Sequence, residues 1–209
     1  MKLQALMLSA SIDTAREVAP VADVGKGDAV CCGFCAQPGA TFPARVRGPE
    51  GESIRGCALC FLAEHLDRPS IDEEASLIWL PEVSQVVINT LIRVIHIRLR
   101  TLGETLHAEF RLSLDTEERR RLFHARALLQ SRAAAAAARL GTERPSDLAG
   151  AMLRFSDAAY RQRFKLLGGL RLLPSGRFFE GDRDIYPEIV DRWRAAIDGN
   201  AAPNMAGAG

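Results

Sequence analysis

Two C-x-x-C pairs constrain this chain more than any other feature of its sequence. Cys32 and Cys35 form the first pair, Cys57 and Cys60 form the second, and residues 36–56 separate them. Two such pairs at this separation are typical of a zinc site. Zn²⁺ accepts four thiolates in a tetrahedron, and a two-residue spacer lets each pair turn both sulfurs toward one ion. We therefore predict a zinc site with these four cysteines as its ligands.

Other interpretations of the cysteines remain open, although the sequence favours them less. Two disulfides fit poorly with C-x-x-C pairs in a chain without an export signal, and a thioredoxin-like redox motif would explain only one pair. Cys31 could replace Cys32 as a ligand, but a three-residue spacer would then separate it from Cys35. His65 is a further possible ligand, although a single histidine on a short helix is more often a surface or packed residue.

The predicted site is structural rather than catalytic because four sulfurs complete its coordination shell. A catalytic zinc keeps one position open for water, usually beside three protein ligands. The free energy of metal binding would instead contribute to folding, on the order of 10 kcal/mol at neutral pH. Gly33, inside the first pair, is expected to provide a tight turn with a positive φ.

Composition places the chain among ordinary globular proteins and limits its partners. It has 209 residues, of which 47% are hydrophobic and 25% charged, a mixture that can bury a core. The formal net charge is +1, whereas nucleic-acid-binding proteins usually carry a clear basic excess, so we expect no nucleic-acid partner. Cysteine usage favours a reducing, cytoplasmic compartment. The apolar run in residues 1–10 is too short and interrupted for a signal peptide, and no apolar run is long enough for a membrane span.

The residues around the cysteine pairs predict a small ββα unit. Residues 41–46 and 52–55 have the pattern of two strands, and the turn-forming residues 48–51 would join them as a hairpin. A helix over residues 61–66 follows the second pair. A further strand is predicted over residues 75–80, where a short apolar run precedes a proline.

The remainder of the chain is predicted to be mostly helical. The predicted helices cover residues 82–102, 115–140, 145–155, 156–167 and 186–198, with a connection over residues 170–175 and an edge strand over residues 3–12. The expected fold is therefore α+β and mostly helical. Residues 1–80 would hold the zinc module, residues 81–198 a helical bundle-like part packed on it, and residues 199–209 a disordered tail.

The predicted helix over residues 82–102 has two notable features. It carries two apolar stripes, which predicts that it packs on more than one side. One stripe consists of Val83, Val87, Leu91, Val94 and Ile95, and the other of Ile88, Ile92 and Leu99. Its second half is rich in positive charge, which suits the helix dipole and solvent better than a phosphate-binding patch. The residues concerned are Arg93, His96, Arg98 and Arg100.

Known catalytic patterns are missing from the sequence. It contains no P-loop, no G-x-S-x-G and no dinucleotide-binding fingerprint, and its histidines are scattered. HNH-type nucleases also place a ββα unit between two C-x-x-C pairs, but they need a histidine on the hairpin as general base and beside a catalytic metal. No histidine lies between Cys32 and Cys60. We therefore expect no enzymatic activity, with a zinc-dependent nucleic-acid binder or HNH-like endonuclease as the alternative.

Several short motifs follow one another in a fixed order over roughly residues 30–198. In this order they resemble the DotN/IcmJ family, which belongs to the Dot/Icm type IVB secretion system and to related conjugation systems. The motifs are the two cysteine pairs, Cys57-Ala58-Leu59-Cys60-Phe61, Leu77-Ile78-Trp79-Leu80-Pro81-Glu82 with Gln85 and Asn89, Ser146-Asp147, residues 170–175 and Trp193. The resemblance implies a degenerate HNH-like zinc fold with a helical part and no nuclease activity. It also implies an adaptor that binds an extended C-terminal segment of the VirD4-like coupling ATPase. Such a protein would be cytoplasmic and would meet the inner membrane only through its partners.

Overall fold

The computed structural model describes most of the chain, in several parts. These are residues 3, 5–10, 31–39, 42–44, 54–107 and 116–200. Within them, helices dominate and are accompanied by short antiparallel strands, so the predicted mixture of helix and strand is confirmed. Across these residues, no helix combines the length and apolar character that a membrane crossing requires. The predicted tail begins inside a helix that continues to Asn200, and residues 201–209 lie outside the described residues.

A β-hairpin and a helix lie around the two cysteine pairs. β1 (Phe42–Ala44) and β2 (Ile54–Gly56) pair antiparallel, and α1 (Ala58–Glu64) follows at once. The predicted order of strand, strand and helix is thus confirmed, while the turn predicted over residues 48–51 lies outside the described residues. The helix begins earlier than predicted because Cys57 has an extended backbone and occupies the N-cap position.

A second antiparallel pair of strands lies at the centre of the molecule. β3 (Ala75–Trp79) pairs with β4 (Leu170–Pro174), with Leu77 opposite Leu172. The strand predicted near residues 75–80 is therefore confirmed, but the connection predicted over residues 170–175 is wrong, because that segment forms β4. The two strands come from opposite sides of the predicted boundary at residue 80, and that division into two parts stays a prediction.

The two outer edges of the β3–β4 sheet are both hydrogen-bonded. Along β3, Leu77 N donates to Glu143 O (2.8 Å) and Trp79 N donates to Arg132 O (3.2 Å). Along β4, the side-chain amide of Gln85 donates to Leu172 O and accepts from Leu172 N, each at 2.7 Å. A two-stranded sheet therefore needs no third strand here, because loops and one side chain satisfy its edge groups.

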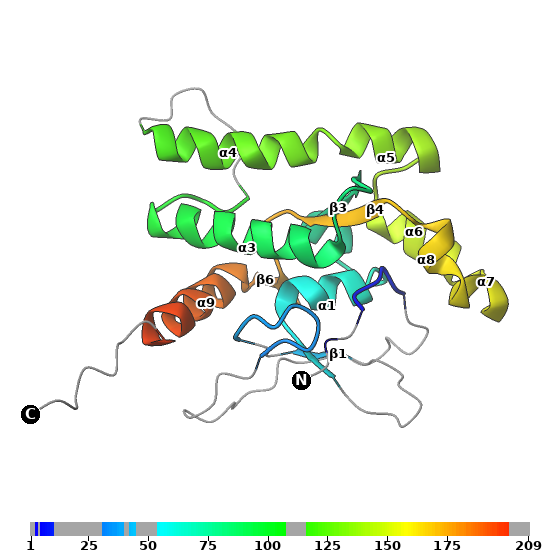
Figure 1. Cartoon of the computed structure of the whole chain (residues 1–209), viewed down its shortest axis with the longest axis horizontal. Helices are drawn as coiled ribbons and strands as arrows, with labels where there is room; N and C mark the ends of the chain where they lie inside the picture. The colour runs from blue at the N-terminus through cyan, green and yellow to red at the C-terminus, as the bar shows by residue number, and fades with distance from the viewer. Residues whose placement is uncertain are drawn as a thin grey trace, which may run out of the picture.

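The central helix, α3 (Gln85–Thr101), begins three residues later than predicted. Ser84 has an extended backbone, and its Oγ accepts a hydrogen bond from Val87 N (3.4 Å), as an N-cap residue does. The helix packs on β4, on α1 and on the C-terminal helix α9 (Tyr186–Asn200). It therefore lies at the junction of the sheet, the hairpin unit and the end of the described chain (Figure 1).

Only one of the two apolar stripes predicted on α3 is buried. Ile88, Ile92 and Leu99 are at most 1% exposed, as expected for a stripe in the core. The other stripe is largely open to solvent, with exposed fractions of 49% at Val87, 41% at Leu91 and 53% at Val94. The prediction that this helix packs on more than one side is confirmed by its contacts with β4, α1 and α9, although within the second stripe Ile95 is buried while these three side chains face solvent.

The helix predicted over residues 115–140 is interrupted. α4 (Glu117–Gln130) and α5 (Ala133–Leu140) run end to end along one side of the molecule (Figure 1). At the break, Arg132 O accepts the hydrogen bond from Trp79 N on the edge of β3. The same carbonyl also accepts from Ala136 N (3.3 Å) at the start of α5, so the break lies where this stretch of backbone meets the edge of the sheet.

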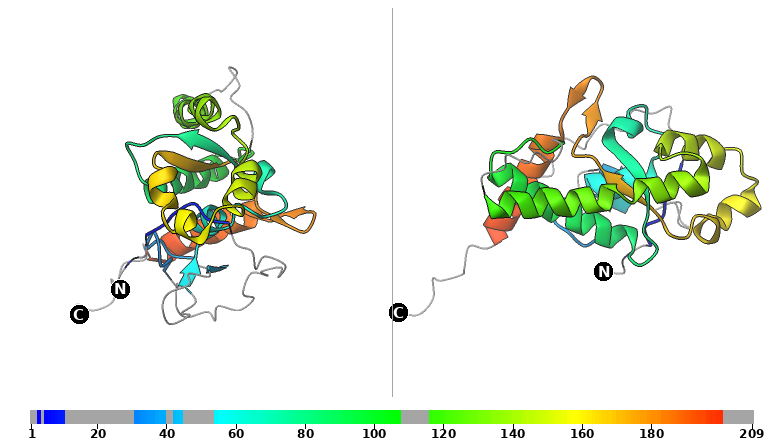
Figure 2. Two further views of the ribbon diagram at one scale, coloured as in Figure 1. Left: turned by 90° about the vertical axis from the view of Figure 1, so that its right-hand side faces the viewer. Right: turned by 90° about the horizontal axis from the view of Figure 1, so that it is seen from above.

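The remaining elements are short, apart from α9. They are α2 (Ile71–Glu74), α6 (Pro145–Met152), α7 (Asp157–Arg161), α8 (Arg163–Leu166), β5 (Phe179–Glu180) and β6 (Arg183–Asp184). The helix predicted over residues 145–155 ends at Met152, and the one predicted over residues 156–167 is two helices separated by Gln162. The helix predicted over residues 186–198 is confirmed as α9. The β5–β6 hairpin, which was not predicted, projects from the molecule as the orange pair of strands in Figure 2.

The described residues near the N-terminus do not form the edge strand predicted over residues 3–12. Residues 5–10 instead lie in an irregular conformation against the end of α1. Ser9 N donates to Ala63 O (3.0 Å), and Ser9 O accepts from Leu66 N (2.9 Å). Residues 4, 11 and 12 lie outside the described residues.

Candidate metal centre

Four cysteine side chains from two distant stretches of the chain meet beside α3. Cys32 and Cys35 lie in the loop before β1, whereas Cys57 and Cys60 lie at the start of α1. Their sulfur atoms are all within 4.8 Å of one another, and Cys35 Sγ lies 3.8 Å from Cys57 Sγ. A tetrahedral zinc with Zn–S bonds of about 2.3 Å requires sulfur atoms about 3.8 Å apart. The predicted ligand set therefore fits one metal ion of this size.

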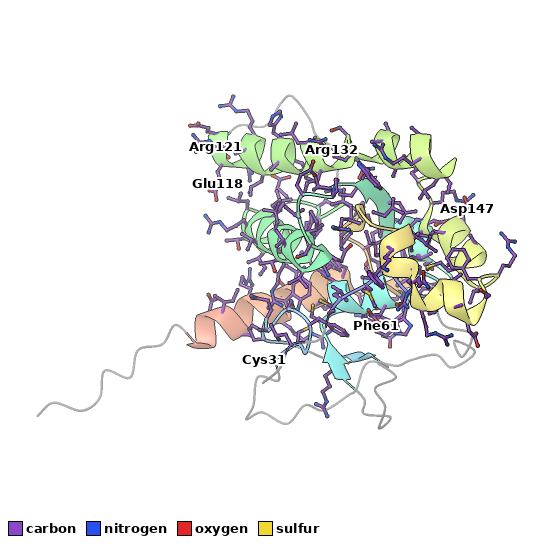
Figure 3. The ribbon with its side chains drawn as sticks, turned by 45° about the vertical axis from the view of Figure 1, so that its right-hand side comes forward. Cys31, Phe61, Glu118, Arg121, Arg132 and Asp147 are labelled. Carbon is purple, nitrogen blue, oxygen red and sulfur yellow. The ribbon has the colours of Figure 1, made fainter. Side chains whose placement is uncertain are left out.

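The other interpretations of the cysteines fit the structure less well. None of the five cysteines is in a disulfide, and the 3.8 Å separation is far longer than the roughly 2.05 Å of an S–S bond. Cys31, which is labelled in Figure 3, is exposed, and it is not part of the four-sulfur group. His65 is buried with its ring 4.2 Å from that of Phe61, and it is also not part of the group.

Backbone hydrogen bonds fix the loop that carries the first pair. Cys32 N donates to Gln37 O (2.8 Å), Ala36 N donates to Cys32 O (2.9 Å), and Gly33 N donates to Arg55 O on β2 (2.9 Å). The positive φ expected at Gly33 is instead found at Ala36, where φ is 58°. The turn predicted at Gly33 is present over residues 33–35, but its left-handed residue is Ala36, at the end of the turn, and not Gly33.

The thiols influence one another strongly because three of the four are buried together. The pKa of Cys32 is lowered because the Cys35 thiol, and then those of Cys57 and Cys60, donate to its thiolate. The pKa of Cys60 is raised because its thiol donates to Cys32 and because burial disfavours a further thiolate. In this cluster one thiol loses its proton easily, whereas the loss of a further proton is disfavoured. A bound cation would stabilise the additional thiolates, as expected for a metal site.

A chain of hydrogen bonds joins this cluster to the central sheet. Asn89 Nδ2 on α3 donates to Cys60 Sγ at 3.5 Å, and Asn89 Oδ1 accepts from Gln85 Nε2 at 2.9 Å. Gln85 is in turn bonded to both backbone groups of Leu172 on β4. Because all three side chains are buried, their positions are fixed by one another.

Arg93, one turn beyond Asn89 on α3, places a buried cation near the same cluster. Its side chain is 3% exposed, donates from Nη2 to Pro38 O (2.8 Å) and lies 4.5 Å from the ring of Trp193. Burial lowers the pKa of Arg93, and the nearby charges of Cys57 and Cys35 oppose that shift. Four thiolates with one Zn²⁺ carry a net charge of about −2, which the guanidinium partly balances. The solvent-facing role predicted for Arg93 is therefore wrong.

We predict that Asn89→Leu weakens metal retention by about 10- to 100-fold, because it removes the N–H donor to Cys60 Sγ without changing the volume of the side chain greatly. Competition between the protein and a chromophoric chelator measures this effect. Thr90→Val is the matched control, since Thr90 Oγ1 donates to Val86 O within α3 and has no bond to a sulfur. Equal retention in both variants would contradict a role for Asn89 in the metal centre.

The predicted positive cluster at the end of α3 is dispersed in the structure. His96 is fully buried and its Nδ1 lies 2.7 Å from Tyr186 Oη, while burial lowers the pKa of His96 to about 3. Arg98 pairs with Glu118 on α4 (2.5 Å), and Arg100 pairs with Asp191 on α9 (2.7 Å). These side chains therefore do not form an open phosphate-binding patch, and only the two arginines occupy the exposed positions expected of the cluster.

The buried neutral His96 predicts a specific dependence of stability on pH. Its folded pKa of about 3 lies below the unfolded value of about 6.5, so stability is lost as pH falls below about 6.5. Between pH 7.5 and 5.5 this histidine contributes a loss of about 1.4 kcal/mol in the free energy of unfolding. Urea unfolding of the metal-loaded protein should show that loss reduced in His96→Leu and retained in His124→Leu, which changes an exposed histidine. An identical pH slope in both variants would show that His96 does not cause it.

The sequence matches no protein-family model and no curated protein. The resemblance to the DotN/IcmJ family therefore stays a prediction.

Proposed function

We propose that this protein is a non-enzymatic, zinc-containing adaptor of a type IVB secretion coupling complex, where it binds the C-terminal region of the VirD4-like coupling ATPase. The single observation that carries the proposal is the group of four sulfur atoms. Thiolates would fill every position of a tetrahedral zinc, so the ion would hold the chain together and offer no open position to a substrate. The protein would act in the cytoplasm and reach the inner membrane through the ATPase.

The placement of the family-like motifs supports this proposal. The motif over residues 77–82 contributes to β3, and the one over residues 170–175 forms β4, its partner. Gln85 and Asn89 connect β4 to Cys60, and Trp193 packs against the arginine behind the cluster. Segments scattered along the sequence thus build one scaffold around the cysteines, as expected if the resemblance reflects a common fold.

The alternative, a nucleic-acid binder or HNH-like endonuclease, is less well supported. Two of the four basic residues on α3 are buried, and the other two are paired with carboxylates. The sequence between the two cysteine pairs offers no histidine to act as a general base.

Co-expression with the C-terminal region of the coupling ATPase encoded in the same genome tests the proposal. We expect a stable complex that survives gel filtration at physiological salt, and no complex with the nucleotide-binding part of the same ATPase. A metal-loaded protein that fails to bind the C-terminal region would contradict the adaptor function. Cleavage of plasmid DNA in the presence of Mg²⁺ would instead favour the endonuclease.

A further inference from the structure

A cavity of about 220 Å³ lies between residues 6–8, the start of α3 and the turn that connects α8 with β4. Its wall is partly apolar and partly cationic. The apolar part comes from Leu6, Leu8, Phe164, Leu167 and Leu170, and the cationic part from Arg163 and Arg171. Among the described residues that line it there is no aspartate or glutamate. The cavity is partly open to solvent, and Phe164 in its wall is 54% exposed.

Neutral groups hold both arginine side chains in place. Arg171 Nε donates to Val83 O (2.6 Å), while Arg163 donates from Nε to Leu8 O (3.2 Å) and from Nη2 to Ser9 Oγ (3.0 Å). Within the described residues neither guanidinium forms an ion pair, unlike Arg68 or Arg100 elsewhere in the fold. Two arginine residues therefore line one cavity, and no carboxylate of the described residues pairs with either of them.

One carboxylate that interacts electrostatically with Arg163, that of Glu64, is hydrogen-bonded outside the cavity. Glu64, at the end of α1, accepts a hydrogen bond from Met7 N (3.3 Å) and does not line the cavity. Burial raises the pKa of Glu64 to about 7, so at neutral pH it is only partly charged. It consequently leaves much of the positive charge in the cavity uncompensated.

The start of α3 adds to the same electrostatic preference. Ser84 and Gln85 line the cavity, and the first N–H groups of a 17-residue helix carry partial positive charge. A helix end alone would not define a ligand, but here it lies beside two guanidinium groups and an apolar wall. The three features together favour an anion that is attached to an apolar group.

We infer that this cavity binds a carboxylate-bearing segment of a partner polypeptide, with the carboxylate near Arg163 and Arg171 and an adjacent aliphatic side chain on the apolar wall. An uncharged apolar segment would remove two guanidinium groups from water without giving them a counterion. The desolvation of these charges would oppose its binding. Inorganic phosphate would pair with the arginines but leave the apolar wall unused. One part of this inference rests on the proposed adaptor function, namely that the ligand is a polypeptide.

Two synthetic peptides test the inference on the full-length, metal-loaded protein. One is acetyl-Gly-Leu-Glu-Leu-Gly-amide, and the other has glutamine in place of glutamate. Titration followed by ¹H–¹⁵N NMR is expected to shift the amide signals of Gly168 and Gly169, which line the cavity. We expect the glutamate peptide to bind at least about tenfold more tightly than the glutamine peptide, because only the carboxylate pairs with the arginines.

Two substitutions identify the groups responsible. Arg171→Gln removes one guanidinium, and Ser84→Asp places a carboxylate at the cavity while keeping a good N-cap for α3. Each should weaken binding of the glutamate peptide by about tenfold or more. Ser84→Asn, a neutral N-cap, and Arg161→Gln, an exposed arginine on α7 outside the cavity, are the matched controls and should bind like the natural protein.

The outcomes separate this inference from the adaptor proposal. Equal affinity for the two peptides, shifts confined to other surfaces, or phosphate binding as tightly as the glutamate peptide would each overturn it. If the ATPase C-terminal region binds Ser84→Asp and Ser84→Asn equally well, the cavity is not its docking site and the adaptor function stands. If the glutamate peptide binds as expected but the ATPase region does not bind, the cavity inference survives and the adaptor proposal fails.

Discussion

Replacement of Cys57 by serine is expected to release the metal and to unfold the region around both cysteine pairs. A serine hydroxyl is a poor zinc ligand at neutral pH, and the three remaining thiolates would lose the ion's compensating charge. Cys57 is 1% exposed, and its Sγ lies 3.8 Å from Cys35 Sγ, so removing this sulfur also removes a contact with the first pair. A structural zinc contributes about 10–16 kcal/mol of apparent binding energy, comparable with the whole stability of a domain.

Elemental analysis of purified protein gives the direct measurement, with soluble yield and thermal unfolding as further readouts. We expect about one zinc per natural chain, little or none in Cys57→Ser, and a large loss of soluble protein. Cys31→Ser is the matched control, because Cys31 is adjacent in sequence to the first pair but exposed and outside the sulfur cluster. The ligand assignment would be wrong if the two variants retained metal equally, and a metal other than zinc would correct the identity of the ion.

The group of four cysteines could be predicted from the sequence because its signal is local. Two residues between the cysteines of each pair are enough to predict that both sulfurs face one point, whatever surrounds them. The hairpin and the presence of a helix after the second pair follow from the same short segments, although α1 begins three residues earlier than predicted. By contrast, β4 could not be distinguished from a connection, because its partner β3 lies nearly a hundred residues earlier and only the fold brings the two together. The break between α4 and α5 is equally non-local, since a carbonyl there serves the edge of β3.

The buried polar side chains of α3 beside the candidate metal centre follow a regular spacing in the sequence. A search for apolar stripes alone overlooks this pattern. Gln85, Asn89, Arg93 and His96 recur at intervals of four, four and three residues, so they share one face of α3, and all four are buried. Polar residues at helical spacing usually indicate a solvated face. Here the same spacing marks a buried polar face, whereas Val87, Leu91 and Val94 lie on the exposed side. Burial of such a face depends on partners such as Cys60, Pro38 and Tyr186, which come from other parts of the chain.

A buried ion pair lies beside α1, the helix at whose start two of the four clustered cysteines lie. Glu74 is completely buried and accepts two hydrogen bonds from Arg68, at 2.8 and 2.7 Å, and one from Phe179 N at 2.7 Å. The guanidinium of Arg68 also lies 4.3 Å from the ring of Phe178 and 5.5 Å from that of Phe61, which follows Cys60 in α1. The pair therefore ties the turn after α1 to the β5–β6 hairpin.

Glu74→Gln is expected to lower the free energy of unfolding by about 3–5 kcal/mol, because it leaves the charge of Arg68 largely buried without its counterion. Chemical denaturation of the metal-loaded protein measures the loss. Glu117→Gln is the matched control, since Glu117 pairs with Arg121 on the exposed surface of α4 and such pairs contribute at most about 1 kcal/mol. The double variant Arg68→Met/Glu74→Met should recover much of the loss, because apolar side chains can replace a buried ion pair at little cost. If Glu74→Gln and Glu117→Gln lowered the free energy of unfolding equally, the prediction would be contradicted. Solvent, rather than Glu74, would then stabilise the positive charge of Arg68.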